Sequence, residues 1–126
     1  MKVIPVDPPR VFEVGHPGRE IALRDTARIT LEPDEQVTFV TASGAEYDVA
    51  RKSWGFYATP SLNGRLVQFG FRAALVRSVS ARFYVLLAER EKEAEFLRYL
   101  DAQEMSLVCW LDSEREDRLR HLFGVL

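Results

Sequence analysis

Residues 36–49 read Gln-Val-Thr-Phe-Val-Thr-Ala-Ser-Gly-Ala-Glu-Tyr-Asp-Val and carry the clearest hairpin signal in the chain. Two runs rich in β-branched and aromatic residues flank a turn at Ser43-Gly44. The second run alternates polar with apolar residues, in the order Glu46, Tyr47, Asp48 and Val49. This alternation predicts an antiparallel sheet with one face in water.

A second hairpin is predicted further along the chain. Residues 71–76 and 82–87 are β-prone runs, and the turn between them contains Ser78, Val79 and Ser80. Few polar residues interrupt either run, so both strands are expected to lie centrally in a sheet.

Turn signals divide the first 88 residues at intervals that leave room for strands and little else. They are Pro8-Pro9, His16-Pro17-Gly18, Glu32-Pro33-Asp34, Ser43-Gly44, Thr59-Pro60, Asn63-Gly64 and Ser78–Ser80.

The pattern changes after Ala88. Residues 89–95 are strong helix formers that lead into Phe96 and Leu100, one helical step apart, which predicts an amphipathic helix of about three turns. Residues 107–111 predict a buried strand, and a capping box at 113–116 predicts a final helix. We therefore expect an α+β fold: an antiparallel sheet or partly open barrel built from about the first 88 residues, with two C-terminal helices flanking a short strand.

Length and composition favour one globular domain over residues 1–126. The chain has 17 basic and 19 acidic residues, and 47% of its residues are hydrophobic. No apolar run is long enough to span a membrane, and Met1–Pro9 lacks the apolar core of a signal peptide. A single cysteine, Cys109, lies in the apolar run 107–111 and is expected to be buried in a reducing cytoplasm.

Charge is distributed unevenly along the chain. Residues 49–88 contain six basic and no acidic residues, together with seven of the fourteen aromatic residues. Guanidinium groups pair with phosphate or carboxylate while rings stack, so this composition fits a surface for an anionic, partly planar ligand. In the alternative interpretation these are ordinary core strands, and helix glutamates fold back over the arginines and neutralise them.

The segment Arg51–Arg65 is the strongest candidate binding site. If residues 52–58 form one strand, Lys52, Trp54 and Phe56 share a face and form a cationic stacking platform. The predicted ligand-binding residues are Lys52, Trp54, Phe56, Tyr57, Asn63 and Arg65. The alternative is that Trp54 and Phe56 face the core.

Part of this segment resembles the RNA-binding strand of cold-shock domains and RNA-recognition motifs. The matching positions are Lys52, Trp54, Gly55 and Phe56, whereas Ser53, Tyr57 and Thr59 depart from the pattern. The resemblance implies that the rings stack on bases.

Catalytic motifs are not found in the sequence. His16, Cys109 and His121 lack metal-ligand spacing, so neither a metal site nor a cofactor is expected, and an enzyme is unsupported. The first hypothesis is a binding domain for single-stranded nucleic acid or a phosphorylated or acidic sugar. The alternative is a protein-interaction or accessory subunit, a homodimer included. No membrane partner is expected.

Overall fold

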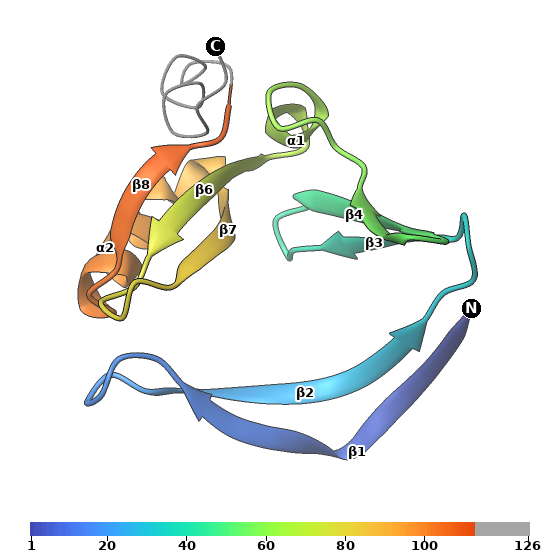
Figure 1. Cartoon of the computed structure of the whole chain (residues 1–126), viewed down its shortest axis with the longest axis horizontal. Coiled ribbons are helices and arrows are strands. Elements are labelled where there is room, and N and C mark those ends of the chain that lie inside the picture. Colours follow the sequence, from blue (N-terminus) through green and yellow to red (C-terminus); the bar gives the residue numbers. More distant parts are fainter. Residues whose placement is uncertain (113–126) are drawn as a thin grey trace. The chain divides into compact units, whose positions relative to one another are not determined.

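The predicted antiparallel strand pairing forms, but in three separate sheets, one of which includes a strand beyond residue 88. The computed structural model describes residues 1–112, and its chain contacts divide them into two units. The first unit comprises residues 1–38 and 48–59, and the second comprises residues 39–47 and 60–112. Figure 1 shows the strands and helices of each unit. A single domain over residues 1–126 stays a prediction.

The first unit contains a long two-stranded ribbon. Strand β1 (Lys2–Val14) pairs antiparallel with β2 (Ile21–Thr30) through the predicted turn around His16-Pro17-Gly18. Pro8-Pro9 do not end a strand as predicted, because they lie inside β1, where the register shifts between Pro5 and Arg10. A bulge accommodates proline, which cannot donate to the ladder, so β1 continues past them.

The hairpin of residues 36–49 is confirmed, and its strands run from one unit into the other. Strand β3 (Gln36–Val40) and strand β4 (Glu46–Lys52) belong to a sheet of order β3-β4-β5. The predicted single strand over residues 52–58 is wrong: β4 ends at Lys52, and β5 (Gly55–Ala58) returns antiparallel to it. Ser53 and Trp54 form the turn, and Gly55 follows with φ +152°, which only glycine adopts without strain.

The second unit is built on a sheet of order β7-β6-β8. Strand β6 (Phe71–Arg77) lies in the centre, between β7 (Phe83–Glu89) and β8 (Ser106–Trp110). The predicted hairpin and the predicted buried strand are thus confirmed, but the expectation that both hairpin strands lie centrally is wrong for β7. Phe83, Tyr84 and Val85 of this edge strand are exposed.

Each face of the second unit's sheet packs its own hydrophobic cluster. Because neighbouring strand residues point to opposite faces, Ala73 and Ala74 belong to different clusters. The predicted helix forms as a 3₁₀ turn (Arg90–Lys92) and α2 (Glu93–Ala102), whose Phe96 and Leu100 pack on the cluster of Ala74. Leu66 of the short helix α1 (Arg65–Gln68) packs on the cluster of Ala73.

Cys109 is fully buried in the second unit, as predicted. The second predicted C-terminal helix, over 113–123, lies outside the described residues. Within residues 1–112, no helix has the length and apolar character needed to cross a bilayer.

Candidate functional site

The β4–β5 hairpin carries four of the six predicted site residues. Its register pairs Arg51 with Phe56 and Lys52 with Gly55. Paired residues share a face, so the Arg51 and Phe56 side chains lie on one face of the hairpin and Lys52 on the other. The predicted common face of Lys52, Trp54 and Phe56 is therefore wrong, because the turn at Ser53-Trp54 reverses the chain inside the proposed strand.

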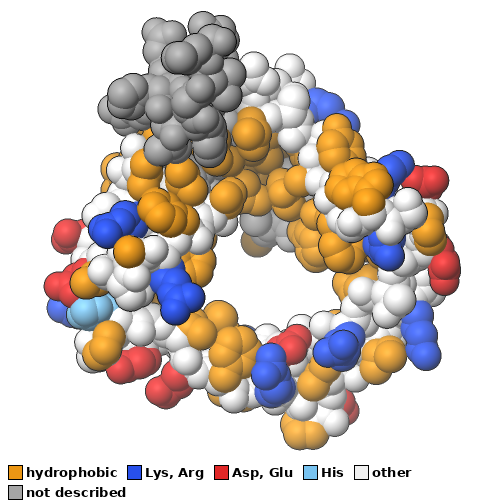
Figure 2. All heavy atoms as spheres, in the orientation of Figure 1, with side chains coloured by type: hydrophobic (Ala, Val, Ile, Leu, Met, Phe, Trp, Pro, Cys, Tyr) orange, Lys and Arg blue, Asp and Glu red, His pale blue; other side chains and the backbone are white. Residues whose placement is uncertain are grey.

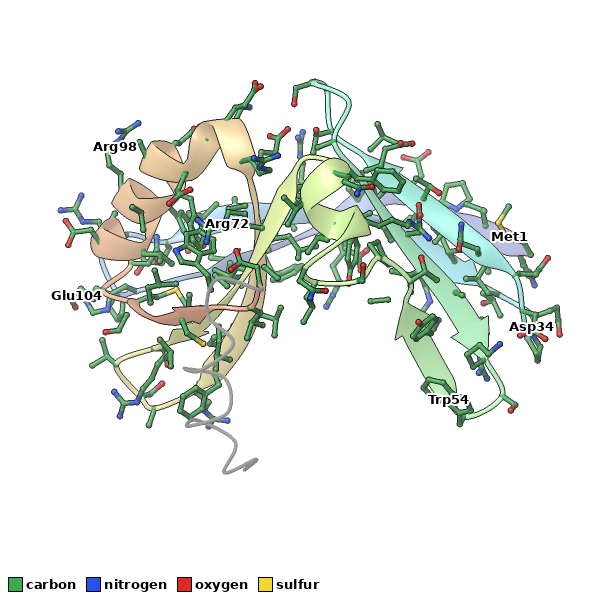
Figure 3. The ribbon with its side chains drawn as sticks, turned by 90° about the horizontal axis from the view of Figure 1, so that it is seen from above. Met1, Asp34, Trp54, Arg72, Arg98 and Glu104 are labelled. Carbon is green, nitrogen blue, oxygen red and sulfur yellow. The ribbon has the colours of Figure 1, made fainter. Side chains whose placement is uncertain are left out.

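Three aromatic side chains of this hairpin are open to water. Trp54 is 71% exposed, Phe56 63% and Tyr57 52%. Trp54 lies at the turn, as its label in Figure 3 shows. Hydrophobic side chains, drawn in orange, are visible on the molecular surface in Figure 2. Exposed apolar side chains are individually common, but three large exposed rings within four residues make this hairpin a candidate interaction site.

Arg51 supplies a positive charge directly beside one of these rings. Its guanidinium carbon lies 5.8 Å from the centroid of Phe56, and Nη1 donates a 3.2 Å hydrogen bond to the carbonyl of Gly55. The Arg51 backbone is fixed as well: its N–H donates to the carbonyl of Glu35 at 2.8 Å, and its carbonyl accepts from Asp34 N–H at 2.6 Å. A guanidinium that stacks on a ring still has N–H groups at its edge, and these can donate hydrogen bonds to an anion.

The positive charge of Lys52 is already balanced by a carboxylate of the same unit. Its ammonium lies 2.5 Å from Oδ1 of Asp34, whose side chain is 73% exposed. A ligand phosphate would have to compete with this carboxylate, so the ammonium adds less to anion binding than the sequence suggested.

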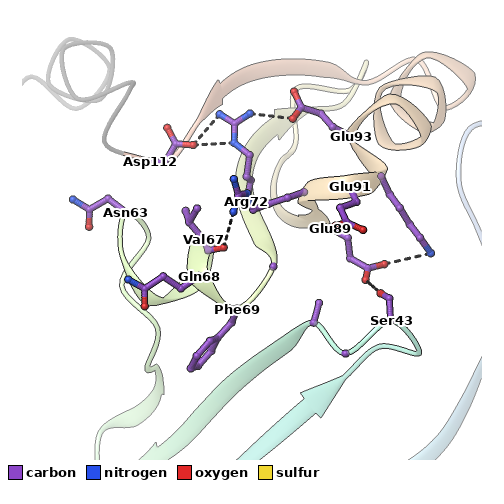
Figure 4. A pocket seen from close by; sticks show the side chains of 15 residues that line it. Ser43, Asn63, Val67, Gln68, Phe69, Arg72, Glu89, Glu91, Glu93 and Asp112 are labelled. Carbon is purple, nitrogen blue, oxygen red and sulfur yellow. Dashed lines mark hydrogen bonds and ion pairs between the residues drawn. The ribbon is translucent and has the colours of Figure 1, made fainter.

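Asn63 and Arg65, the other two predicted site residues, belong to the second unit. Arg65 begins α1, and its guanidinium carbon lies 5.0 Å from the ring centroid of Phe69. Asn63 lines a pocket of about 740 Å³ (Figure 4). The structure thus divides the predicted site between the units, with Lys52, Trp54, Phe56 and Tyr57 in the first.

The pocket of the second unit has a guanidinium network in its wall. Nε of Arg72 donates to Oδ2 of Asp112 at 2.9 Å, and Nη1 donates to Oε2 of Glu93 at 3.2 Å. The guanidinium also lies 4.0 Å from the ring centroid of Trp110. Burial alone would lower the pKa of Arg72, but the hydrogen bonds and charges of Asp112 and Glu93 raise it overall. Glu93 on α2 pairs with Arg72, which is what the alternative interpretation expected of helix glutamates, for one of the six basic residues of 49–88.

Glu89 joins two other parts of the same pocket. Its carboxylate accepts hydrogen bonds from the hydroxyls of Ser43 and Thr41, and Lys92 lies 3.5 Å away. The hydrogen bond from Ser43, followed by that from Thr41, lowers the pKa of Glu89.

The pocket residues bear mixed charge. Three basic and four acidic residues line it: Arg72, Arg90, Lys92, Glu89, Glu91, Glu93 and Asp112. This charge balance gives an anion no net attraction, so the pocket fits the predicted ligand less well than the hairpin does.

Asp112 was missed at the sequence level. The available signal was an acid placed directly after the apolar run 107–111, where an uncompensated carboxylate would be costly. Within residues 1–112 no group of three or more histidine, cysteine, aspartate or glutamate side chains could hold a metal ion.

Comparisons of the chain with known protein families, with curated proteins and with solved structures find no match.

Proposed function

We propose that the β4–β5 hairpin binds a ligand that offers one anionic group beside a planar or apolar surface. Nucleoside monophosphates and phosphorylated or acidic sugars have this chemistry. The observation that carries the proposal is the 71% exposed indole of Trp54 at a turn whose flanking strand holds Arg51 over Phe56. Rings exposed in this way provide stacking surface, and the guanidinium adds a charge-assisted hydrogen bond.

One anionic group fits better than many. Of the two cations on this hairpin, Lys52 is paired with Asp34, which leaves Arg51 as the principal anchor for a phosphate. Phe56 and Tyr57 are successive strand residues and point to opposite faces, so they do not form one continuous base-stacking platform. These two features favour a compact ligand over a long single strand of nucleic acid.

Trp54 fluorescence tests the proposal directly, because the other tryptophan, Trp110, is 4% exposed. We expect titration of the protein with a nucleoside monophosphate or a sugar phosphate to give a saturable change in Trp54 emission. Trp54→Ala should abolish the change, and Arg51→Gln should weaken binding about tenfold, as expected for loss of one charge-assisted bond.

A matched control comes from Phe83, which is 59% exposed against 63% for Phe56 and lies in the second unit. Phe56→Ala should weaken binding, whereas Phe83→Ala should leave it unchanged. If no monophosphate, sugar phosphate or oligonucleotide changes the emission, the proposal is wrong.

Salt dependence separates the ligand classes. A single phosphate should give a slope of about one or less in a plot of log K against log salt, whereas an oligonucleotide that neutralises several phosphates gives a proportionally steeper slope. A steep slope with tight oligonucleotide binding would favour single-stranded nucleic acid instead.

A second candidate function is docking on a protein partner. Trp54, Tyr57 and Arg51 belong to the three residue types most enriched in binding hot spots. A partner that covers the hairpin would shift Trp54 emission to the blue without any small anion present. For either function we place the domain in the cytoplasm, a proposal supported by the low cysteine content of the sequence, in which Cys109 is the single cysteine and is buried.

A further inference from the structure

Strand β7 leaves one side of the second unit's sheet open. It lies at the edge of the order β7-β6-β8 (Figure 1), so no strand within residues 1–112 pairs with its outer backbone N–H and C=O groups. Three successive large side chains on it are exposed: Phe83 by 59%, Tyr84 by 46% and Val85 by 61%.

The other edges of the described sheets carry features that discourage further pairing. Strand β1 contains three prolines and a register shift, and β2 carries Arg24, Asp25 and Arg28. Strands β3 and β5 have five and four residues, and β8 has five with a register shift against β6. Prolines, charges, bulges and short length are the usual protections of an edge.

Strand β7 has none of these protections within residues 83–88. The run Phe-Tyr-Val-Leu-Leu-Ala contains no charge, proline or glycine, and its register against β6 is unbroken from Phe83 to Glu89. Such a regular, uncharged edge is the form of strand that accepts another strand.

We propose that β7 pairs antiparallel with β7 of a second copy, joining two three-stranded sheets across a two-fold axis. The axis must run perpendicular to the sheet, so residues that face each other must lie on the same face of both copies. Placing the axis at Val85 sets Phe83 opposite Leu87 of the second copy and Tyr84 opposite Leu86. Every facing pair from 83 to 87 is then apolar.

Charge disfavours the neighbouring register centred on Leu86. Moving the axis to Leu86 would set Phe83 against Glu89 and Arg82 against Arg90 of the second copy, whereas the Val85 register sets Arg82 against Ala88. Like charges directly opposite each other destabilise a sheet. A second copy offers the matching uncharged strand without requiring any foreign sequence.

The available area indicates a weak dimer. With about 200 Å² for a fully exposed large side chain, the three exposed residues of β7 offer roughly 300 Å² per copy. A stable interface buries about 800 Å² on each partner, so we expect dissociation constants in the micromolar range or weaker.

Sedimentation velocity over a wide concentration range tests the proposal. We expect a monomer–dimer equilibrium that Val85→Lys weakens at least about tenfold, because an ammonium on the axis faces its own copy. Val11→Lys is the matched control, since Val11 on β1 is 62% exposed against 61% for Val85, and it should leave the equilibrium unchanged.

A cysteine on the axis tests the register. Val85→Cys should form an intermolecular disulfide under mild oxidation, because directly opposed strand residues have Cα atoms within disulfide range. The native thiol is buried and should not compete. A strict monomer at all concentrations would overturn the proposal, and so would a dimer that Val85→Lys leaves intact. A dimer in which Val85→Cys forms no disulfide would overturn the register centred on Val85. Trp54→Ala should not affect dimerisation, which keeps this test separate from that of the hairpin.

Discussion

Arg72 is the residue through which the second unit balances its buried charge. Its side chain is 16% exposed and that of Asp112 is 8% exposed, with 2.8 Å between Nη2 and Oδ2. Oδ1 of Asp112 is buried and accepts no hydrogen bond within the described part of the chain. Asp112 therefore depends on Arg72 for compensation, since a buried carboxylate without a cation is costly.

Arg72→Ala should lower the free energy of unfolding by about 3 kcal/mol, because it leaves Asp112 without its cation and removes the stack on Trp110. Arg72→Lys keeps the charge but loses the planar donor geometry, and should cost about 1–2 kcal/mol. Urea denaturation of each variant measures these losses in the free energy of unfolding. Arg77→Ala, an exposed change on the same strand, should stay within about 0.5 kcal/mol; an equal loss at Arg77 would contradict a special role for Arg72.

Glu89 should make stability depend on acid pH. Hydrogen bonds from Ser43 and Thr41 hold its pKa below the ordinary 4.5, so the folded state favours the carboxylate more than the unfolded state does. This contribution is complete well above pH 4.5 and is lost as the pH falls through the folded-state pKa.

The comparison of Glu89→Gln with the wild type should show this dependence. The variant should be less stable at neutral pH, and the difference should shrink below pH 4.5, which urea midpoints between pH 3 and 7 would measure. Glu91→Gln, an exposed neighbour, is the control and should change neither stability nor its pH dependence. If the stability difference between Glu89→Gln and the wild type does not change with pH, the loss of stability comes from the altered side-chain shape and not from the lost charge.

At the scale of elements, the β4–β5 hairpin depends on one backbone conformation. Gly55 has φ +152°, and a Cβ built on it meets nothing within 4 Å, so strain alone opposes a side chain there. Gly55→Ala should destabilise the protein by about 1–2 kcal/mol and displace the Gly55 carbonyl that accepts from Arg51.

Thermal unfolding followed by Trp54 emission would measure that loss. Ser53→Ala changes an exposed residue of the same turn and should cost less than about 0.5 kcal/mol. If Gly55→Ala is as stable as Ser53→Ala, the conformation at Gly55 does not limit the hairpin.

The same hairpin shows where sequence patterns reach their limit. Ser43-Gly44 between two β-prone runs was sufficient to predict β3 and β4, because the turn residues stand between the strands. Trp54-Gly55 was interpreted as strand interior, because a tryptophan at a turn has no polar turn signal and the glycine follows the reversal. The predicted stacking face was lost with that turn, although the aromatic residues themselves proved exposed.

Sheet order was the second feature that local patterns could not provide. Strands β6 and β7 are similarly apolar, yet β6 alone is central, because β8 pairs with it from a position beyond α2. Hydrophobicity reports burial on a face and does not report whether a strand has one neighbour or two. The helix of residues 89–100 was predictable because its 3.6-residue pattern is local.

At the scale of the molecule, burial is concentrated in the second unit. Ala73, Ala74 and Val76 of β6 have no exposed surface, whereas no residue of the β1–β2 ribbon is buried. Two-stranded ribbons are marginally stable in water, and local opening is easiest where few apolar groups are buried. The ribbon should therefore open at much lower free energy than β6.

Amide hydrogen exchange would measure this difference. Peptides covering β6 should exchange slowest and those covering β1 and β2 much faster, at protein concentrations low enough to keep β7 unpaired. An equal protection of ribbon and β6 would mean that the apolar pairs of the ribbon, such as Phe12 with Leu23 and Val14 with Ile21, are covered in solution. Phe12→Ser distinguishes the two cases, because Phe12 is 36% exposed and its loss weakens the ribbon. If the ribbon opens independently, the substitution should leave the protection of β6 unchanged. If the ribbon and β6 form one cooperative unit, the substitution should lower the protection of β6.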